Sequence, residues 1–247
     1  MTKINYLKEL NKSKKPFIIY KSDKGFDLYT DFSKKIILNN NNIKNFINKA
    51  TQFKSKKKET DLFIGFFGYE ILNNLIGIKT KKQKGLKFPK GIFYKPETKI
   101  KLQNKLDYKN LKLINSKKSF KVNINKASYK VIFDKFKRKI RSGETYQIKI
   151  CTKYSNKSQI DVLDFFVRLV KSNMAPEAFM IKDKNYSIIS CSPENLITKK
   201  NDFITTKPIA GTLKKTKRLN KNKALTFFKK NLKETKEHNM IVDMERN

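Results

Sequence analysis

The sequence of 247 residues contains no tryptophan, two cysteines and 21 acidic residues against 58 lysines and arginines. Cys151 and Cys191 lie far apart and lack the spacing of metal ligands, so the sequence predicts reduced thiols and no cysteine-based metal site. No apolar run is long enough to cross a bilayer, and the basic N-terminus lacks an apolar signal core. These absences predict a cytoplasmic protein with no membrane partner.

The positive charge does not by itself indicate a nucleic-acid partner. The formal net charge is +37, but arginine, whose planar fork suits phosphates and bases, occurs only five times. The excess of lysine, together with abundant asparagine, isoleucine and phenylalanine, is typical of AT-rich codon usage. The composition therefore predicts no nucleic-acid partner, although a basic nucleic-acid-binding protein remains an alternative. A positive field would still attract a small dianionic substrate.

Hydrophobic periodicity predicts short strands alternating with amphipathic helices. The clearest helix is expected to begin at the cap Ser128 and to stop at Gly143, because apolar residues recur between them with helical spacing. Asp161 stands near the start of the next helix. Strands are predicted within 16–40 and at 61–67, 91–94, 111–114, 146–154, 177–181 and 187–191, and further helices begin near 43, 71 and 162.

Two corners of small residues stand out in the stretch 186–212. The first is Ser192-Pro193-Glu194, which follows an apolar strand-like run, and the second is Pro208-Ile209-Ala210-Gly211-Thr212. Gly211 allows a backbone N–H to approach a ligand closely, and Thr212 adds a hydroxyl donor. Asn201 and Asp202 supply turn chemistry between two strand-like runs, so the corners are expected to lie near each other.

These corners and a third motif resemble the chorismate-utilising enzymes, which include the large subunits of anthranilate synthase and aminodeoxychorismate synthase. Their hallmark is Ser-Pro-Glu, then Pro-Ile-(Ala or Lys)-Gly-Thr about fifteen residues on, then Lys-Glu-His leading to Arg-Asn-Asp. The third motif appears here as KEHNMIVDMERN at residues 236–247. Three ordered motifs at this spacing make the resemblance specific, and it covers roughly residues 60–247.

The resemblance implies a fold, a division and a set of partners. The fold would be α+β, with antiparallel β-sheets and packed helices. Residues 1–118 would form an N-terminal region, and residues 119–247 the first part of the chorismate-binding catalytic domain. The substrate would be chorismate, the cofactor Mg²⁺, and a glutamine amidotransferase subunit would supply ammonia.

The resemblance also implies roles for individual residues. Glu194 matches the residue proposed as the general acid that protonates the departing ring hydroxyl. Ala210, Gly211 and Thr212 match the substrate-contacting corner, and Glu237 matches a carboxylate that holds Mg²⁺. In isolation, a glutamate in a lysine-rich helix such as Glu237 would be a surface residue.

Two branches of the family remain open. Asn173-Met174-Ala175-Pro176 and the segment Ile19-Tyr20-Lys21-Ser22, where anthranilate synthases have Leu-Leu-Glu-Ser, favour an aminodeoxychorismate synthase and argue against control by tryptophan. Ala210 favours direct addition of ammonia, as in anthranilate synthases, because many aminodeoxychorismate synthases have a nucleophilic lysine there.

The family's later motifs do not follow residue 247 in this sequence. An inactive fragment, or half of a split enzyme, is therefore a further alternative to an active chorismate-aminating subunit.

Overall fold

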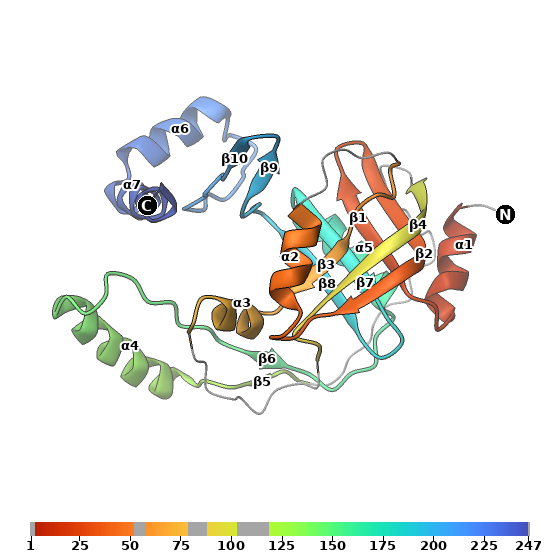
Figure 1. The fold of residues 1–247 in the computed structure, drawn as a ribbon. Coiled ribbons are helices and arrows are strands. Elements are labelled where there is room, and N and C mark those ends of the chain that lie inside the picture. Colours follow the sequence, from red (N-terminus) through yellow and green to blue (C-terminus); the bar gives the residue numbers. More distant parts are fainter. Residues whose placement is uncertain (1–2, 52–57, 79–87, 103–118, 247) are drawn as a thin grey trace. The chain divides into compact units, whose positions relative to one another are not determined.

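The computed structural model describes residues 3–51, 58–78, 88–102 and 119–246 (Figure 1). The chain divides into two compact units, one of Met1–Asp107 with Phe166–Asn247 and one of Tyr108–Phe165. Both units contain helices and strands, and every strand pair in the described part of the chain is antiparallel. The predicted α+β class with antiparallel sheets is confirmed.

The centre of the first unit is a six-stranded sheet with the order β3-β4-β2-β1-β7-β8 (Figure 1). β1 and β2 form a hairpin in which Ser22 pairs with Gly25, and β1 pairs on its other side with β7. Strands far apart in the sequence thus become neighbours. The bounds are β1 Phe17–Ser22, β2 Gly25–Ile37, β3 Ile64–Phe67, β4 Gly91–Leu102, β7 Glu177–Lys182 and β8 Ser187–Ser192.

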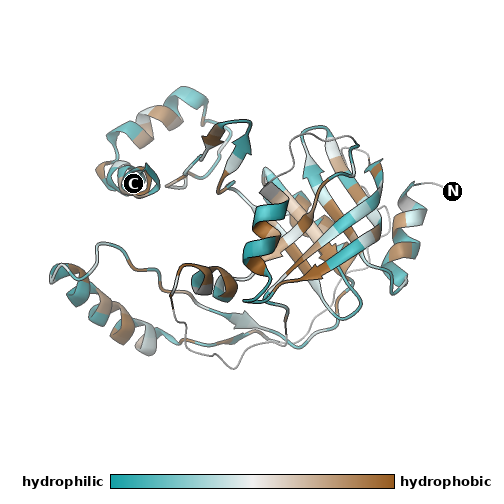
Figure 2. Cartoon of the chain, viewed as in Figure 1, coloured by the Kyte–Doolittle hydropathy of each residue, from teal (hydrophilic) through white to brown (hydrophobic). Residues whose placement is uncertain are grey.

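Apolar residues recur along the strands of this sheet (Figure 2). One buried cluster crosses four of them and contains Ile18, Tyr29, Ile92, Tyr94 and Ile181. Burying side chains of this size contributes on the order of 1.5–3 kcal/mol each, so the cluster is a main source of stability for the sheet.

Helices pack onto the sheet through apolar stripes. In α2 (Ile43–Thr51), Ile43 and Phe46 join a buried cluster with Ile71 of α3 (Tyr69–Leu75). The Phe46 ring lies 4.6 Å from that of Phe93 in β4, measured between centroids. In α5 (Val162–Asn173) Phe166 is fully buried, and α1 (Lys3–Lys12) buries Leu7. Helices α2, α3 and α5 agree with the predictions near residues 43, 71 and 162, whereas α1 was not predicted.

A polar cluster lies within the sheet around Asp183, just after β7. The Asp183 carboxylate accepts hydrogen bonds from Lys35 Nζ at 2.6 Å and from the Tyr94 hydroxyl. The Tyr94 and Tyr186 hydroxyls are 3.0 Å apart. Burial alone would raise the pKa of Asp183, but the hydrogen bonds from Lys35 and Tyr94 outweigh it and bring the pKa below its ordinary value.

The second unit contains α4 (Lys126–Arg141) and a two-stranded sheet of β5 (Lys121–Val122) and β6 (Tyr154–Ser155). The predicted cap of α4 was wrong: the helix is capped by Asn125, whose side chain accepts from the backbone N–H of Ser128 at 2.8 Å. Asparagine is as good a cap as serine, and only the backbone geometry distinguishes them. Gly143 follows the helix with φ +75°, as the predicted stop requires.

The strand predicted at 146–154 was wrong. Only Tyr154 of this segment belongs to a strand. A period-two pattern gives a strand only where a neighbouring strand accepts its hydrogen bonds. The Lys153 carbonyl accepts from the Asn123 N–H beside β5 at 3.1 Å, but residues 146–152 belong to no strand pair in the part of the chain that the structure describes. The strand predicted at 111–114 lies outside the described residues.

β7 and β8 come from the predicted second region, yet they complete the sheet begun by the first. The division into residues 1–118 and 119–247 stays a prediction, because it was defined by resemblance to the family's sequence regions and not by the strands of this sheet. Among the described residues, no helix combines the length and the apolar character needed to cross a membrane.

Candidate functional site

The first corner directly follows β8. The Ser192 hydroxyl donates to the Glu194 carbonyl oxygen at 2.8 Å and accepts from the Glu194 N–H at 3.3 Å, which closes the turn around Pro193. In the sheet Ser192 pairs with Glu177 of β7. The strand end and the serine therefore fix the backbone from which the half-buried Glu194 side chain extends.

A hairpin then returns the chain towards this corner. It consists of β9 (Thr198–Lys200) and β10 (Phe203–Thr205), with Asn201 in the left-handed region at φ 54°. Asparagine is one of the few residues that adopt this conformation readily. The predicted turn at Asn201 and Asp202 is confirmed.

The second corner lies against the first. Glu194 Oε1 accepts a hydrogen bond from the backbone N–H of Ile209 at 3.1 Å. This bond joins Ser192-Pro193-Glu194 to the segment 208–212. The predicted proximity of the two corners is confirmed, and the carboxylate of Glu194 is the group that connects them.

Gly211 is required by both its conformation and its neighbours. Its φ is +81°, and a Cβ atom added there would lie 2.6 Å from Glu234 Oε2 and 2.8 Å from Phe228 Cε1. Any side chain would be strained by the backbone and would displace these atoms. Ala210 is half-buried beside it, whereas Gly211 and Thr212 are exposed.

Two helices follow, α6 (Lys221–Lys230) and α7 (Leu232–Arg246), and α7 carries the third motif. Its Glu234 lies beside Gly211, and its Glu245 accepts a hydrogen bond from the Thr206 hydroxyl. The predicted metal ligand Glu237 is exposed on the same helix. The structure thus places the Glu194 carboxylate at the second corner. Helix α7 contacts the segment 206–211 through Glu234 and Glu245.

Sequence reasoning missed Glu234 and Glu245. A signal for them was present, since residues 234, 238, 241 and 245 follow the i, i+4, i+7, i+11 spacing of one helix face. All four are half-buried. A search for this spacing over 232–246, which includes residues 236–246 of the third motif and the four residues before it, would have placed both glutamates on one helix face.

The described residues do not fit a metal site by themselves. Glu237 lies about one helical turn after Glu234, but no group of three or more His, Cys, Asp or Glu side chains in the described ranges is close enough together to hold an ion. Mg²⁺ takes several oxygen ligands in near-octahedral geometry. The described residues alone therefore do not supply a complete set of magnesium ligands.

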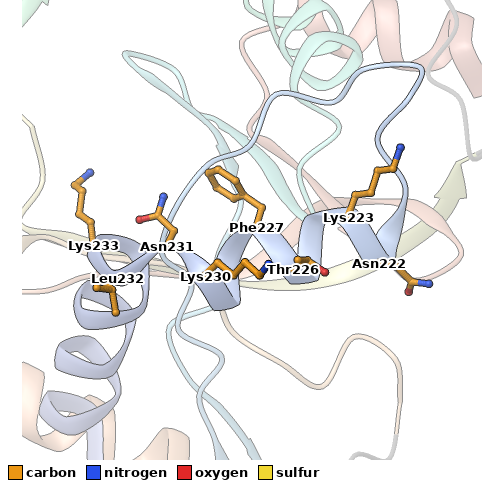
Figure 3. A pocket seen from close by; sticks show the side chains of 8 residues that line it. All are labelled: Asn222, Lys223, Thr226, Phe227, Lys230, Asn231, Leu232 and Lys233. Carbon is orange, nitrogen blue, oxygen red and sulfur yellow. The ribbon is translucent and has the colours of Figure 1, made fainter.

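A pocket of about 890 Å³ lies where α6 meets α7 (Figure 3). None of the five predicted site residues lines it. It is lined by Asn222, Lys223, Thr226, Phe227, Lys230, Asn231, Leu232 and Lys233.

Comparison with known proteins identifies the class. The family model described as chorismate binding enzyme matches residues 6–247, and the chain belongs to this family. A match to aminodeoxychorismate synthase component 1 of Bacillus subtilis (strain 168) is 31% identical over 130 residues, which are 52% of this chain and 28% of that protein.

Anthranilate synthase component 1 proteins are equally similar. The protein of Arthrobacter globiformis is 33% identical over 129 residues, 50% of this chain and 24% of that protein. The protein of Buchnera aphidicola subsp. Tetraneura caerulescens is 28% identical over 277 residues, 90% of this chain and 52% of that protein. The chain therefore spans between about a quarter and a half of the length of these curated relatives. These similarities establish a family of chorismate-using enzymes and leave the particular reaction open.

Proposed function

We propose that the chain serves in the amination of chorismate, as a large-subunit sequence of the aminodeoxychorismate synthase type. The observation that carries the proposal is the hydrogen bond from the Ile209 N–H to Glu194 Oε1, since it joins the two corners that match the family's site. The product would be 4-amino-4-deoxychorismate, which belongs to p-aminobenzoate and folate synthesis.

Glu194 is proposed as the general acid. Loss of the C4 hydroxyl from chorismate requires a proton, and a carboxyl group within reach supplies it, an effect of about 10²–10⁴-fold in rate. With Oε1 engaged by the Ile209 N–H, Oε2 is left to carry this proton. Ala210, Gly211 and Thr212 are proposed to contact the substrate, as the family resemblance implies. On the Cβ side of Gly211 the space is taken by Glu234 and Phe228, so the substrate would approach this corner from another side.

Ammonia is the proposed amino donor, delivered by a separate glutamine amidotransferase subunit. Ala210 carries no nucleophile, so the chain has no covalent lysine at this position. For the proposed product, ammonia would therefore form the new C–N bond at C4 of chorismate, and the C4 hydroxyl would leave as water with the proton supplied by Glu194. Mg²⁺ is the cofactor that the family resemblance implies, with Glu237 as one ligand, and the described residues supply too few neighbouring carboxylates to complete its shell. The division into 1–118 and 119–247 belongs to the same proposal.

Anthranilate synthase component I, in tryptophan biosynthesis, is the second candidate. Ala210 favours it, because direct addition of ammonia at C2 of chorismate leads towards anthranilate.

The test is to incubate the purified chain with chorismate, Mg²⁺ and ammonium at mildly alkaline pH and to separate the products by chromatography and mass. Aminodeoxychorismate is expected, and Glu194→Gln, which should turn over at least about tenfold more slowly, is the matched control. Formation of anthranilate would instead show that the chain acts as an anthranilate synthase component I. If neither product forms although circular dichroism shows a folded chain, and calorimetry detects no chorismate binding, the proposal is refuted for this chain and the inactive fragment takes its place.

A further inference from the structure

The carboxylate of Glu177 lies behind the first corner and bridges two parts of the chain. Its Oε2 atom accepts a hydrogen bond from the Tyr20 hydroxyl at 2.8 Å, and its Oε1 atom accepts from Asn195 Nδ2 at 3.2 Å. Tyr20 belongs to β1, whereas Asn195 directly follows Glu194. One half-buried carboxylate thus connects the N-terminal strand to the residue beside the proposed acid.

Sheet register explains why these groups meet. Glu177 pairs with Ser192 across β7 and β8, and Tyr20 pairs with Phe179 across β1 and β7. Residues 177 and 179 lie on the same face of β7, so Tyr20 is a diagonal neighbour of Glu177. Burial and then the hydrogen bond to Glu177 raise the pKa of Tyr20 to about 12, so the hydroxyl stays a donor at neutral pH.

Asn195 is itself held at both ends of its amide. Its Nδ2 donates to Glu177, and its Oδ1 accepts from the Thr198 hydroxyl at 3.1 Å. An amide fixed in this way limits rotation of the backbone on the C-terminal side of Glu194. On the N-terminal side, Ser192 already closes the turn.

We propose that Glu177 is a positioning residue of the site: its carboxylate holds Asn195 and thereby fixes the Glu194 side chain against the Ile209 N–H. This inference rests on the proposed function for its catalytic meaning, but the positioning itself needs no substrate. None of the motifs in the sequence includes Glu177, and its role arises only from the pairing of β7 with β1 and β8.

The direct test is hydrogen exchange of the Ile209 amide, the donor that Glu194 accepts. Glu177→Ala removes both bonds of the bridge, so exchange in the peptide containing Ile209 is expected to become about tenfold faster, as for loss of one to two ordinary hydrogen bonds. Glu177→Gln retains an acceptor for Asn195 and should restore most of the protection. Glu97→Ala, which removes an exposed glutamate from β4 of the same sheet, is the matched control and should change nothing.

A double-mutant cycle shows whether Asn195 transmits the effect. If it does, Glu177→Ala made in an Asn195→Ala background adds little to the exchange rate. Fully additive effects, or unchanged exchange in a folded Glu177→Ala chain, would overturn the proposal.

A kinetic measurement then separates positioning from substrate contact. If the unaltered chain turns over chorismate, Glu177→Ala should lower kcat about tenfold and leave KM within about twofold. The lost contacts orient the proposed acid Glu194 and do not bind substrate. A raised KM at constant kcat would contradict this role. Absence of turnover in the unaltered chain would count against the proposed function alone, because the exchange result stands without it.

Discussion

Replacing Gly211 by alanine tests the geometry of the second corner, and the chain offers a close control. Gly211 has φ +81° with Glu234 and Phe228 in the space of a Cβ atom, whereas Gly77 has φ +80° with no described atom within 4 Å of that space. Both glycines belong to the same compact unit. The two substitutions therefore share the backbone strain and differ in the steric contact.

The magnitudes follow from these two contributions. A left-handed alanine costs about 1–2 kcal/mol, which is the whole effect expected for Gly77→Ala. Gly211→Ala adds an overpacking contribution of about 1–2 kcal/mol, towards the low end because the end of the Glu234 side chain can move aside. We expect Gly211→Ala to be the more destabilising by roughly 1 kcal/mol or more.

Urea unfolding followed by far-UV circular dichroism measures the difference. With a slope of about 2–3 kcal/mol per M, 1 kcal/mol corresponds to a midpoint lower by roughly 0.3–0.5 M for Gly211→Ala than for Gly77→Ala. Equal midpoints would show that Glu234 and Phe228 do not pack against Gly211, and the contact between α7 and the second corner would then be wrong.

Three further changes have defined outcomes. Glu194→Gln should leave chorismate binding intact by calorimetry and lower turnover at least about tenfold, and an unchanged rate would remove Glu194 from the mechanism. Asp183→Asn should destabilise the fold by about 1–3 kcal/mol at neutral pH, because Lys35 loses its ionised partner. The folded-state pKa of Asp183 is lowered, so its contribution is present above its unfolded-state pKa and is lost as the pH falls through the folded value. The difference in urea midpoint should thus vanish in acid, and a pH-independent difference would contradict the ion pair. Asn125→Ala should weaken α4 by about 1 kcal/mol in thermal unfolding, whereas Ser128→Ala should have little effect; the reverse order would restore Ser128 as the cap.

Local chemistry made much of the fold predictable from the sequence. The turn at Asn201 and the stop at Gly143 depend on neighbouring residues alone. So does the helix start expected near Asp161, whose side chain accepts from the Asp164 N–H at 2.8 Å. The ordered motifs likewise located the two corners. Information within a few residues sufficed for these features.

Features that depend on distant partners were not predictable in this way. Residues 146–152 have the alternation of a strand, but no described strand pairs with them, so the pattern was misleading. Glu177 carries no local signal, because its role comes from strands that meet only in the folded sheet. The predicted site residues themselves stay predictions, while the hydrogen bond between the corners gives Glu194 a defined place.

The position of β1 between β2 and β7 has a consequence for biosynthesis on the ribosome. Tyr20 and Glu177 are 157 residues apart. At about 5–20 residues per second, roughly eight to thirty seconds pass between their syntheses. During that interval the β1–β2 hairpin exposes an unpaired edge next to apolar residues, a template for association with other nascent chains. We therefore expect slow translation or a shortage of chaperones to reduce the yield of folded protein, while the site in the chains that do fold stays unchanged.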